Sequence, residues 1–321
     1  MAALNHWLSL VLGLGLLYVG AQVLIKGGAA IALRLGLNSL VVGLTVIAYG
    51  TSSPEMVVSF KASVTGNGAI AIGNVVGSNI CNIVLILAVC SLVSPVSAST
   101  QVIRREIPIT IGVSLLLCVL LWDGSLSRFD GAVLFAGIVA YTVFTVRDAR
   151  RASAAQATAE YEAEFPERKS SLLMALVLVL LGLGVLVGGS QLFVDGAVKL
   201  AQSWGVSQAV IGLTIVAVGT SMPEFATSLV AAFRRHADVA IGNIVGSNIF
   251  NILGILGTAA MLQPIDATGI SRVDLAVMLV AAVSLFPLAR SGGRISRWEG
   301  AALLVLYVAY TIWLIRGIGS T

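Results

Sequence analysis

Two glutamates lie inside segments of the sequence that are otherwise almost wholly apolar. Glu55 and Glu224 each follow a Thr-Ser-x-Pro motif, at 51–54 and at 220–223. A carboxylate in such a segment is costly unless it faces a cavity or a partner, so acids of this kind usually belong to a functional site. Neither motif contains a Lys or an Arg that could serve as that partner. The chemistry that these residues predict is the binding of a cation by oxygen ligands.

The proline in each motif supports the same interpretation. A proline inside a helix removes one N–H donor and clashes with the carbonyl group four residues earlier. Within a bilayer, a carbonyl without its helical partner is tolerated only where it lines a cavity or meets another partner. Hard cations such as Ca²⁺ and Na⁺ prefer oxygen ligands. We expect the following carbonyl groups to be tilted or freed: Gly50 and Thr51 in the first motif, and Gly219 and Thr220 in the second.

Helical spacing gathers further candidate ligands around the two acids. Residues three or four positions apart share one face of a helix. Each motif places its glutamate on such a face. The face in the first half consists of Ala48, Ser52 and Glu55, and the face in the second half consists of Ala217, Ser221 and Glu224. The segment after each motif supplies a second face, with Asn74, Ser78 and Asn82 and with Asn243, Ser247 and Asn251. Each half of the chain thus presents a face of hydroxyl and carboxylate groups and a face of amide and hydroxyl groups.

The segments that carry these residues are predicted to be membrane helices, because the composition excludes an ordinary soluble protein. Of the 321 residues, 58% are hydrophobic and 11% are charged, and the mean hydropathy is +0.99. Soluble domains are about 45–50% apolar and about 25% charged. A helix needs about 20 mostly apolar residues to cross a bilayer. We predict an all-α integral membrane protein with ten transmembrane helices, at 8–32, 39–64, 69–93, 107–122, 129–147, 171–200, 207–232, 238–262, 273–290 and 299–316.

The two halves of the chain repeat one another at a constant offset of 169 residues. Gly43–Glu55 matches Gly212–Glu224, and Gly73–Asn82 matches Gly242–Asn251. Over the 40-residue stretch that contains both motifs, 21 positions are identical, and these include Gly, Thr, Ser, Pro, Glu and Asn. Each half holds five predicted spans, an odd number, so the second half enters the membrane inverted. Inverted repeats are a transporter architecture that binds its substrate near the midplane of the membrane.

The polar residues divide the chain and orient it. Residues 148–170 form the one long polar stretch, which we expect to be a cytoplasmic linker between the first five-helix repeat, 1–147, and the second, 171–321. With the N-terminus outside, 14 of the 19 Lys and Arg residues fall on the inner side. Basic loops remain in the cytoplasm. Both termini are therefore predicted to lie outside the cell membrane.

Other kinds of site find little support in the sequence. Cys81, Cys90 and Cys118 lie in separate apolar runs, and His6 and His236 are far apart, so neither a disulfide nor a zinc framework is expected. The basic residues form no patch with interleaved aromatics, which argues against nucleic acid as a partner. We expect no catalytic group and no resident cofactor, and the sequence indicates no protein partner.

The paired motifs resemble the two alpha repeats of the cation/Ca²⁺ antiporter superfamily, and specifically those of its prokaryotic sodium/calcium exchanger family. The resemblance covers essentially the whole chain and implies that Glu55 and Glu224 are central carboxylate ligands. It implies hydroxyl ligands from Ser52, Ser78, Ser221 and Ser247 and backbone carbonyl ligands from Ala48, Thr51, Ala217 and Thr220. By the same resemblance, spans one and six correspond to a helix pair that slides across the core to alternate access.

One position departs from the pattern of the family. Some members carry Asp at the position of Asn251, whereas here both Asn82 and Asn251, which are candidate ligands too, are amides. The site then has a formal charge of −2. Two carboxylates about 5 Å apart repel by about 3 kcal/mol at an effective dielectric constant near 20, so a load of two positive charges is favoured. One Ca²⁺ or two Na⁺ satisfies this, and the number of Na⁺ per cycle stays open.

The leading hypothesis is a secondary antiporter of a prokaryotic cell membrane that exchanges Ca²⁺ for Na⁺ by alternating access. Its expected partners are Ca²⁺, Na⁺ and the lipid bilayer. An antiporter that uses H⁺ in place of Na⁺, for Ca²⁺ or another divalent cation, is the main alternative. A cation channel could use the same oxygens, but such a pore is usually built at the axis of an oligomer. An intramembrane hydrolase could use two acids as general acid and base, yet the sequence shows no accompanying nucleophile.

Overall fold

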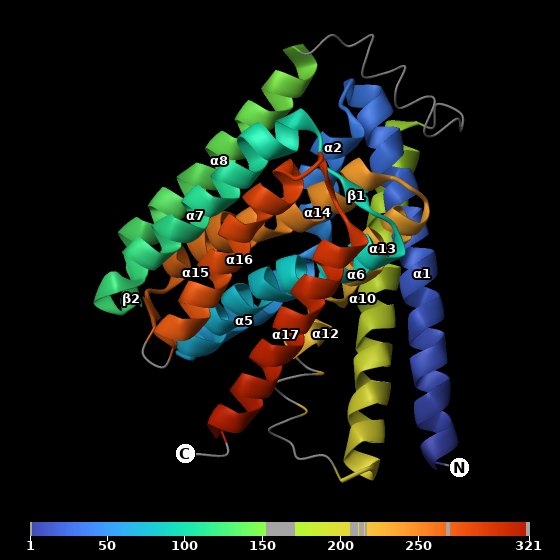
Figure 1. Ribbon diagram of the computed structural model, residues 1–321, viewed down its shortest axis with the longest axis vertical. Helices are drawn as coiled ribbons and strands as arrows, with labels where there is room; N and C mark the ends of the chain where they lie inside the picture. Colours follow the sequence, from blue (N-terminus) through green and yellow to red (C-terminus); the bar gives the residue numbers. More distant parts are fainter. Residues whose placement is uncertain are drawn as a thin grey trace.

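The computed structural model describes residues 2–151, 171–205, 211, 215, 217–267 and 270–318, and most of these residues are helical (Figure 1). The helices of the first half are α1 (Ala2–Leu35), α2 (Ser39–Val42), α3 (Ala48–Thr51), α4 (Ser53–Val64), α5 (Gly68–Ile80), α6 (Leu87–Val93), α7 (Ile107–Leu120) and α8 (Arg128–Arg151). Those of the second half are α10 (Leu172–Ser203), α12 (Ala217–Gly219), α13 (Met222–Phe233), α14 (Ala237–Phe250), α15 (Gly257–Leu262), α16 (Arg272–Arg290) and α17 (Arg297–Ile318).

Eight helical segments of the described chain are long and apolar enough to cross a bilayer. They are His6–Leu35, Gly68–Val93, Val102–Asp123, Arg128–Arg151, Leu172–Ser203, Ala237–Leu262, Arg272–Arg290 and Arg297–Arg316. A ninth combines Ser39–Thr51 and Ser53–Val64, which are bent by 48°. The nine lie where the sequence predicts spans, with small differences at their ends. The remaining predicted span, 207–232, falls partly outside the described residues, so the total of ten helices stays a prediction.

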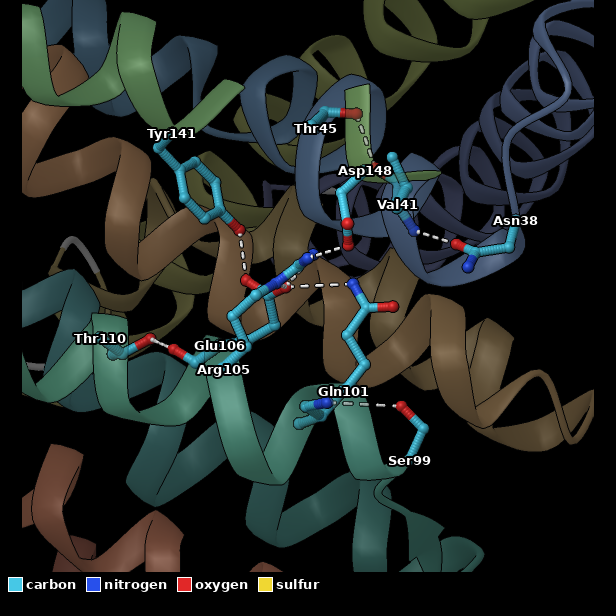
Figure 2. A network of polar contacts seen from close by, with 11 residues as sticks. Asn38, Val41, Thr45, Ser99, Gln101, Arg105, Glu106, Thr110, Tyr141 and Asp148 are labelled. Carbon is cyan, nitrogen blue, oxygen red and sulfur yellow. Dashed lines mark hydrogen bonds and ion pairs between the residues drawn. The ribbon is translucent and has the colours of Figure 1, made fainter. Parts of the chain in front are cut away.

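The end of the first half differs from the sequence-based expectation. α8 continues to Arg151, so residues 148–151 of the expected linker are helical. Asp148 forms an ion pair with Arg105, which lies just before α7, and this contact gives the polar end of α8 a tertiary partner (Figure 2). The other expected linker residues, 152–170, lie outside the described part of the chain.

Four short π-helical turns have both ends within the described residues, and the sequence did not predict them. They are Gly43–Ile47, Cys81–Ile86, Val102–Glu106 and Asn251–Leu256. The second and fourth begin beside or at the candidate ligands Asn82 and Asn251. Single π-helical turns inside α-helices occur frequently at functional sites.

The centre of the molecule is formed by two related segments, Gly68–Val93 and Ala237–Leu262, which are largely buried. Peripheral helices such as α17 expose much of their apolar surface, as membrane-facing helices do. Close packing at the centre requires glycine at position 246, because a Cβ there would lie 2.5 Å from the carbonyl oxygen of Leu44. α14 therefore lies directly against the backbone of the π-helical turn at Gly43–Ile47.

α1 and α10 form a closely packed antiparallel pair at one side of the molecule (Figure 1). The pair meets through glycines that recur every seventh residue, at Gly13, Gly20 and Gly27 in α1 and at Gly182, Gly189 and Gly196 in α10. A Cβ at any of these positions would lie 2.5–3.0 Å from an atom of the partner helix. The glycines therefore allow close contact between the two helices along most of their length.

Two short strand pairs join the halves, a small departure from the all-α expectation. β1 (Val96–Ser97) pairs antiparallel with β4 (Arg294–Ile295), and β2 (Ser125–Leu126) pairs antiparallel with β3 (Ile265–Asp266). The two pairs are related by the same offset of 169 residues. The first turn of α1 and the last turn of α17 lie at one end of the molecule, whereas α8 ends and α10 begins at the opposite end (Figure 1).

Candidate functional site

Both proline motifs interrupt a helix. In the first half, Ser52 lies between α3 and α4, and the second residue of α4 is Pro54. In the second half, α12 ends at Gly219, and Pro223 is the second residue of α13. The proline nitrogen cannot donate to the carbonyl four residues earlier, which belongs to Gly50 or Gly219. The expected break is therefore present in each half.

The carbonyl groups of Gly50 and Gly219 nevertheless have hydroxyl donors, which corrects the expectation of tilted or freed carbonyl groups for these two residues. The hydroxyl of Ser53 donates to the carbonyl oxygen of Gly50 at 2.6 Å. The hydroxyl of Ser190, in α10, donates to the carbonyl oxygen of Gly219 at 2.8 Å. A buried carbonyl that loses its helical donor is costly, so a side-chain donor replaces it. These two carbonyls are accordingly less suited to bind an ion than the sequence suggested.

The two glutamates lie together at the centre of the molecule, and both are fully buried. Each carboxylate accepts a hydrogen bond from the serine of the other half. Ser52 donates to Oε1 of Glu224 at 2.7 Å, and Ser221 donates to Oε1 of Glu55 at 3.0 Å. Because each serine lies three residues before its own glutamate, this exchange of partners brings the two carboxylates into one site.

The threonines of the two motifs also bind across the halves. The hydroxyl of Thr51 donates to Oδ1 of Asn243 at 3.1 Å, and that of Thr220 lies 3.5 Å from Oδ1 of Asn74. The amide nitrogens of Asn74 and Asn243 lie 3.0 and 2.9 Å from the hydroxyl groups of the serines at 59 and 228. Both amides are thereby oriented with the oxygen toward the threonine of the other half.

Among the remaining alanine and serine candidates, Ala48 and Ser247 are in contact with one another. The carbonyl oxygen of Ala48 accepts from the hydroxyl groups of Thr51, at 3.2 Å, and Ser247, at 3.4 Å. Ser78 is buried, and its hydroxyl has no hydrogen-bond partner among the described residues. Ala217 is the first residue of α12, two positions before Gly219.

The asparagines at the start of the central π-helical turns form a reciprocal pair of contacts. The amide nitrogen of Asn82 donates to Oδ1 of Asn248 at 3.0 Å, and that of Asn251 donates to Oδ1 of Asn79 at 3.0 Å. All four side chains are buried. The amide nitrogens of Asn82 and Asn251 are thus used in hydrogen bonds to the other half. Their amide oxygens, Asn82 Oδ1 and Asn251 Oδ1, have no hydrogen-bond partner in the described structure.

The site thus contains a set of buried oxygens that accept no hydrogen bond from the described residues. These atoms are Oε2 of Glu55, Oε2 of Glu224, Oγ of Ser78, Oδ1 of Asn82 and Oδ1 of Asn251. Buried polar atoms almost always have a partner, so such a set requires an explanation. Carboxylate, amide and hydroxyl oxygens are the ligands of hard cations such as Ca²⁺ and Na⁺. The donor set fits a transported cation of this class.

One pair of residues in the site, Asn79 and Asn248, was missed by the sequence analysis, and these two residues orient the candidate ligands. Asn74 and Asn243, which helical spacing did single out, accept from the threonines. Asn79 and Asn248 lie in the repeated Gly-Ser-Asn motif, which is the signal that could have found them. The spacing of four residues passes over Asn79 and Asn248, because their contacts run to the other half rather than along their own helix.

A cavity of about 380 Å³ extends to the edge of the site at Thr220. It lies between α4, α10 and α12, and its lining includes Ser53 and Pro54, Ser190 and Asp195, and Thr220. The corresponding region of the second half is closed, because residues of α1, including Leu17 and Ala21, share one apolar cluster with residues of α13, including Met222 and Ala226. A hydrogen bond between Arg234 and Gln22 adds to this closed contact. The two sides of the site therefore differ in access.

A third fully buried carboxylate, Glu106, lies outside the site in the network that Figure 2 shows. Its Oε1 accepts from Arg105 at 2.7 Å and from Gln101 at 3.1 Å, and its Oε2 accepts from the hydroxyl of Tyr141 at 2.9 Å. Arg105 also pairs with Asp148. Glu106 joins the turn before α7 to α8, and both of its oxygens are satisfied by the protein. Its role is structural.

Comparison with known proteins gives four findings. The family model described as sodium/calcium exchanger protein matches residues 5–147 and 174–316. The sodium/calcium exchanger MaX1 of Methanosarcina acetivorans is 31% identical over 343 residues, which cover 96% of this chain and 98% of that protein. CaxA of Alkalimonas amylolytica is 41% identical over 246 residues, which cover 75% of this chain and 76% of that protein. A solved structure of the sodium-calcium exchanger NCX_Mj, soaked with zero Na⁺ and Ca²⁺, has a TM-score of 0.82 and 33% identity and covers 97% of this chain and 99% of that chain.

Proposed function

The chain belongs to the sodium/calcium exchanger protein family, and from this premise we propose that it exchanges Ca²⁺ for Na⁺ at the site around Glu55 and Glu224. As a member of this family, it is a multi-pass membrane transporter and not an enzyme. MaX1 and NCX_Mj are both named as exchangers of these two ions. The choice between Na⁺ and H⁺ as counter-ion is the part of the proposal that is specific to this chain.

The observation that carries the proposal is the pair of buried carboxylates, each with one oxygen bound to a serine of the opposite half and one oxygen without a partner. A bound cation accounts for the unpartnered oxygens and for the cost of two burials at once. We assign the carboxylates of Glu55 and Glu224 as the shared ligands. The other proposed ligands are the hydroxyl groups of Ser52, Ser78, Ser221 and Ser247, the amide oxygens of Asn82 and Asn251, and the carbonyl groups of Ala48, Thr51, Ala217 and Thr220.

Exchange, rather than leak, follows from competition for the same oxygens. The site holds no third carboxylate, since the described residues include no cluster of three or more His, Cys, Asp or Glu. Its charge of −2 is balanced by one Ca²⁺ or by two Na⁺, so either load neutralises the site but both together do not. An empty site would leave two buried charges uncompensated, which disfavours its movement across the membrane.

Alternating access is supported by the unequal surroundings of the site. The cavity beside α4 and α10 is open, whereas α1 is packed on α13. An inverted repeat can exchange these two arrangements, because each half can adopt the conformation of the other. We propose that the α1–α10 pair moves as a unit relative to the rest of the protein and closes one side as it opens the other.

The topology that accompanies this mechanism is ten transmembrane helices in two inverted five-helix repeats, 1–147 and 171–321, joined by a cytoplasmic linker within 148–170. We propose that both termini lie outside the cell membrane, on the basis of the Lys and Arg distribution. The open cavity then faces the outside, because α4 runs from the site toward the end of the molecule at which the chain begins.

Transport by purified protein in liposomes tests the proposal. We expect Ca²⁺ uptake when Na⁺ is loaded inside and diluted outside, and no uptake when Na⁺ is equal on both sides. Uptake that follows a proton gradient and ignores Na⁺ would replace the proposal with H⁺/Ca²⁺ antiport. Ca²⁺ flux that needs no counter-ion would contradict exchange altogether and indicate a channel. An imposed membrane potential should leave the uptake rate unchanged if two Na⁺ are exchanged for each Ca²⁺, because no net charge then moves. It should change the rate if three Na⁺ are exchanged for each Ca²⁺.

A further inference from the structure

α10 crosses both proline breaks, but it contacts them in different ways. At the first break, the side chain of Leu183 covers Gly50, where an added Cβ would lie 2.8 Å from Leu183 Cδ2. At the second break, Val194 covers Gly219 in the same apolar manner, at 2.8 Å from an added Cβ. Among the described residues, a hydrogen bond from α10 reaches the second break alone, where Ser190 donates to the carbonyl oxygen of Gly219 at 2.8 Å.

The difference arises because different residues donate a hydrogen bond to the carbonyl group at the break of each half. Each proline leaves the carbonyl four residues earlier without its helical donor. In the first half, Ser53 supplies a hydroxyl from within the motif itself. The equivalent residue in the second half is Met222, which has no hydroxyl, and the donor is Ser190 of α10. The residue of α1 that is equivalent to Ser190 is Ala21.

The carbonyl that Ser190 holds is next to the ion site. Gly219 directly precedes Thr220, whose hydroxyl faces Asn74, and Ser221, whose hydroxyl donates to Glu55. Ser190 itself is 6% exposed and lies where the open cavity reaches the break. A hydrogen bond in such a sheltered position contributes more than one in water, and a buried carbonyl that loses its donor is costly.

We propose that Ser190 is a positioning residue that couples the movement of α10 to the ion site by holding the second break in the conformation found when the cavity beside α4 is open. The inference rests on the proposed alternating access, since it is the displacement of α10 that breaks the contact. The equivalent residue of α1, Ala21, cannot form such a hydrogen bond to the first break, because it lacks a hydroxyl. The carbonyl group of Gly50 accepts from Ser53 instead. The halves of the transporter are therefore not energetically equivalent, and Ser190 biases the protein toward the open-cavity state.

Labelling of the cavity tests this coupling without depending on the counter-ion. Gln191 lines the cavity and is exposed, so a single cysteine at Gln191→Cys, in a protein whose three native cysteines are replaced by alanine, reports the open state to an impermeant maleimide. We expect Ser190→Ala to slow this labelling by about two- to five-fold, the loss that one hydrogen bond of typical net strength produces. Ser190→Thr, which keeps the hydroxyl, should label close to the parent rate.

A rescue experiment tests whether Gly219 needs a hydrogen bond from α10 or only a hydrogen bond from any donor. Met222→Ser gives the carbonyl group of Gly219 a local donor of the kind that Ser53 gives Gly50. It does not restore the hydrogen bond between Gly219 and α10. We expect the pair Ser190→Ala with Met222→Ser to label as slowly as Ser190→Ala with Met222→Ala, which leaves the same space but no hydroxyl. Recovery of the parent rate by the serine variant alone would overturn the proposal, as would parent-rate labelling of Ser190→Ala itself.

A hydrogen bond from α1 to the first break should have the opposite effect on the cavity. Ala21→Ser together with Ser53→Met moves the hydroxyl donor of the first break from the motif to α1. We expect this variant to favour the closed cavity and to label more slowly than Ser53→Met alone. Equal rates would contradict the inference. Wild-type exchange in the same liposomes is measured in parallel, so a chain that labels as expected but fails to exchange Na⁺ for Ca²⁺ refutes the proposed function and not the role of Ser190.

Discussion

The surroundings of Glu106 and those of the Glu55–Glu224 pair differ although all three carboxylates are fully buried. Both oxygens of Glu106 are bound by the protein, and Arg105 supplies a neighbouring positive charge. Each glutamate of the pair has one serine donor and one oxygen without a partner in the described structure. Burial of an acid alone therefore does not identify a site. The difference lies in whether the protein itself completes the coordination of the carboxylate.

The repeat separates the two regions in a second way. The glutamates of the site occur at equivalent positions in both halves, as do their serine, threonine and asparagine partners. Glu106 is equivalent to Leu275, and Arg105 is equivalent to Asp274, so the structural network has no second copy. A related contact survives in the second half, where Tyr310, equivalent to Tyr141, donates to Asp274 at 2.7 Å. The residues proposed to bind ions are thus repeated in both halves, whereas the residues that join the turn before α7 to α8 are not.

Neutralising the acids is expected to have the largest effect and to separate the two regions most clearly. Glu55→Gln and Glu224→Gln should each reduce Ca²⁺ uptake to the level of protein-free liposomes, because the site loses a charge that the cation needs. Glu106→Gln keeps hydrogen bonds to Gln101 or Tyr141 within reach and should retain most of the uptake. Uptake assays on the three variants check this. Full activity in either site variant would remove the basis of the ligand assignment.

Removing the positive partner of Glu106 should damage stability instead of transport chemistry. Arg105→Met leaves a buried carboxylate without its ion pair, and breaking such a pair typically costs about 3 kcal/mol or more. We expect a lower unfolding temperature in detergent, with an unchanged Ca²⁺ concentration for half-maximal uptake in the protein that remains folded. Glu224→Gln is the matched comparison, since it should alter uptake with little change in unfolding temperature. The reverse pattern in these two variants would mean that the regions have exchanged roles.

Adding a carboxylate to the site should strengthen its attraction for cations. Asn251→Asp raises the formal charge from −2 to −3, and a charge about 5 Å away at an effective dielectric constant near 20 is worth about 3 kcal/mol before desolvation is subtracted. We expect the Ca²⁺ concentration for half-maximal uptake to fall by about ten-fold. Asn82→Asp is the symmetric control. A change in neither variant would place these two positions outside the ion-binding shell.

The smallest expected effect concerns the residues that orient the amide ligands. Asn248→Leu removes the acceptor that holds the nitrogen of Asn82, so the amide is free to turn its nitrogen toward the ion. We expect a several-fold weaker response to Ca²⁺, because a donor then competes with a ligand oxygen. The loss should be smaller in the Asn82→Asp background, since a carboxylate has no nitrogen to turn. An equal loss in both backgrounds would show that Asn248 acts on packing alone.

Much of the helical framework could be predicted from the sequence, because the bilayer imposes a length and a composition on each span. Nine segments lie close to their predicted limits. The exceptions are local: α8 runs on to Arg151 because Asp148 has a tertiary partner, and the π-helical turns have no compositional signal. The mutual contacts of the site were beyond sequence reasoning. Helical spacing places Ser52 and Glu55 on one face of a single helix, but the structure pairs Ser52 with Glu224 of the other half.

The sequence by itself determined the membrane environment, the twofold repetition and the two acids that cannot be buried without a partner. These follow from the free energy of transferring apolar and charged groups, which depends on residue type and length of segment. The tertiary structure decided which buried acid the protein satisfies and which it leaves open, which amide nitrogens are engaged, and that Ser190 and not a residue of its own motif serves Gly219. Such choices depend on distances of a few ångströms between groups far apart in the chain, and no local pattern encodes them.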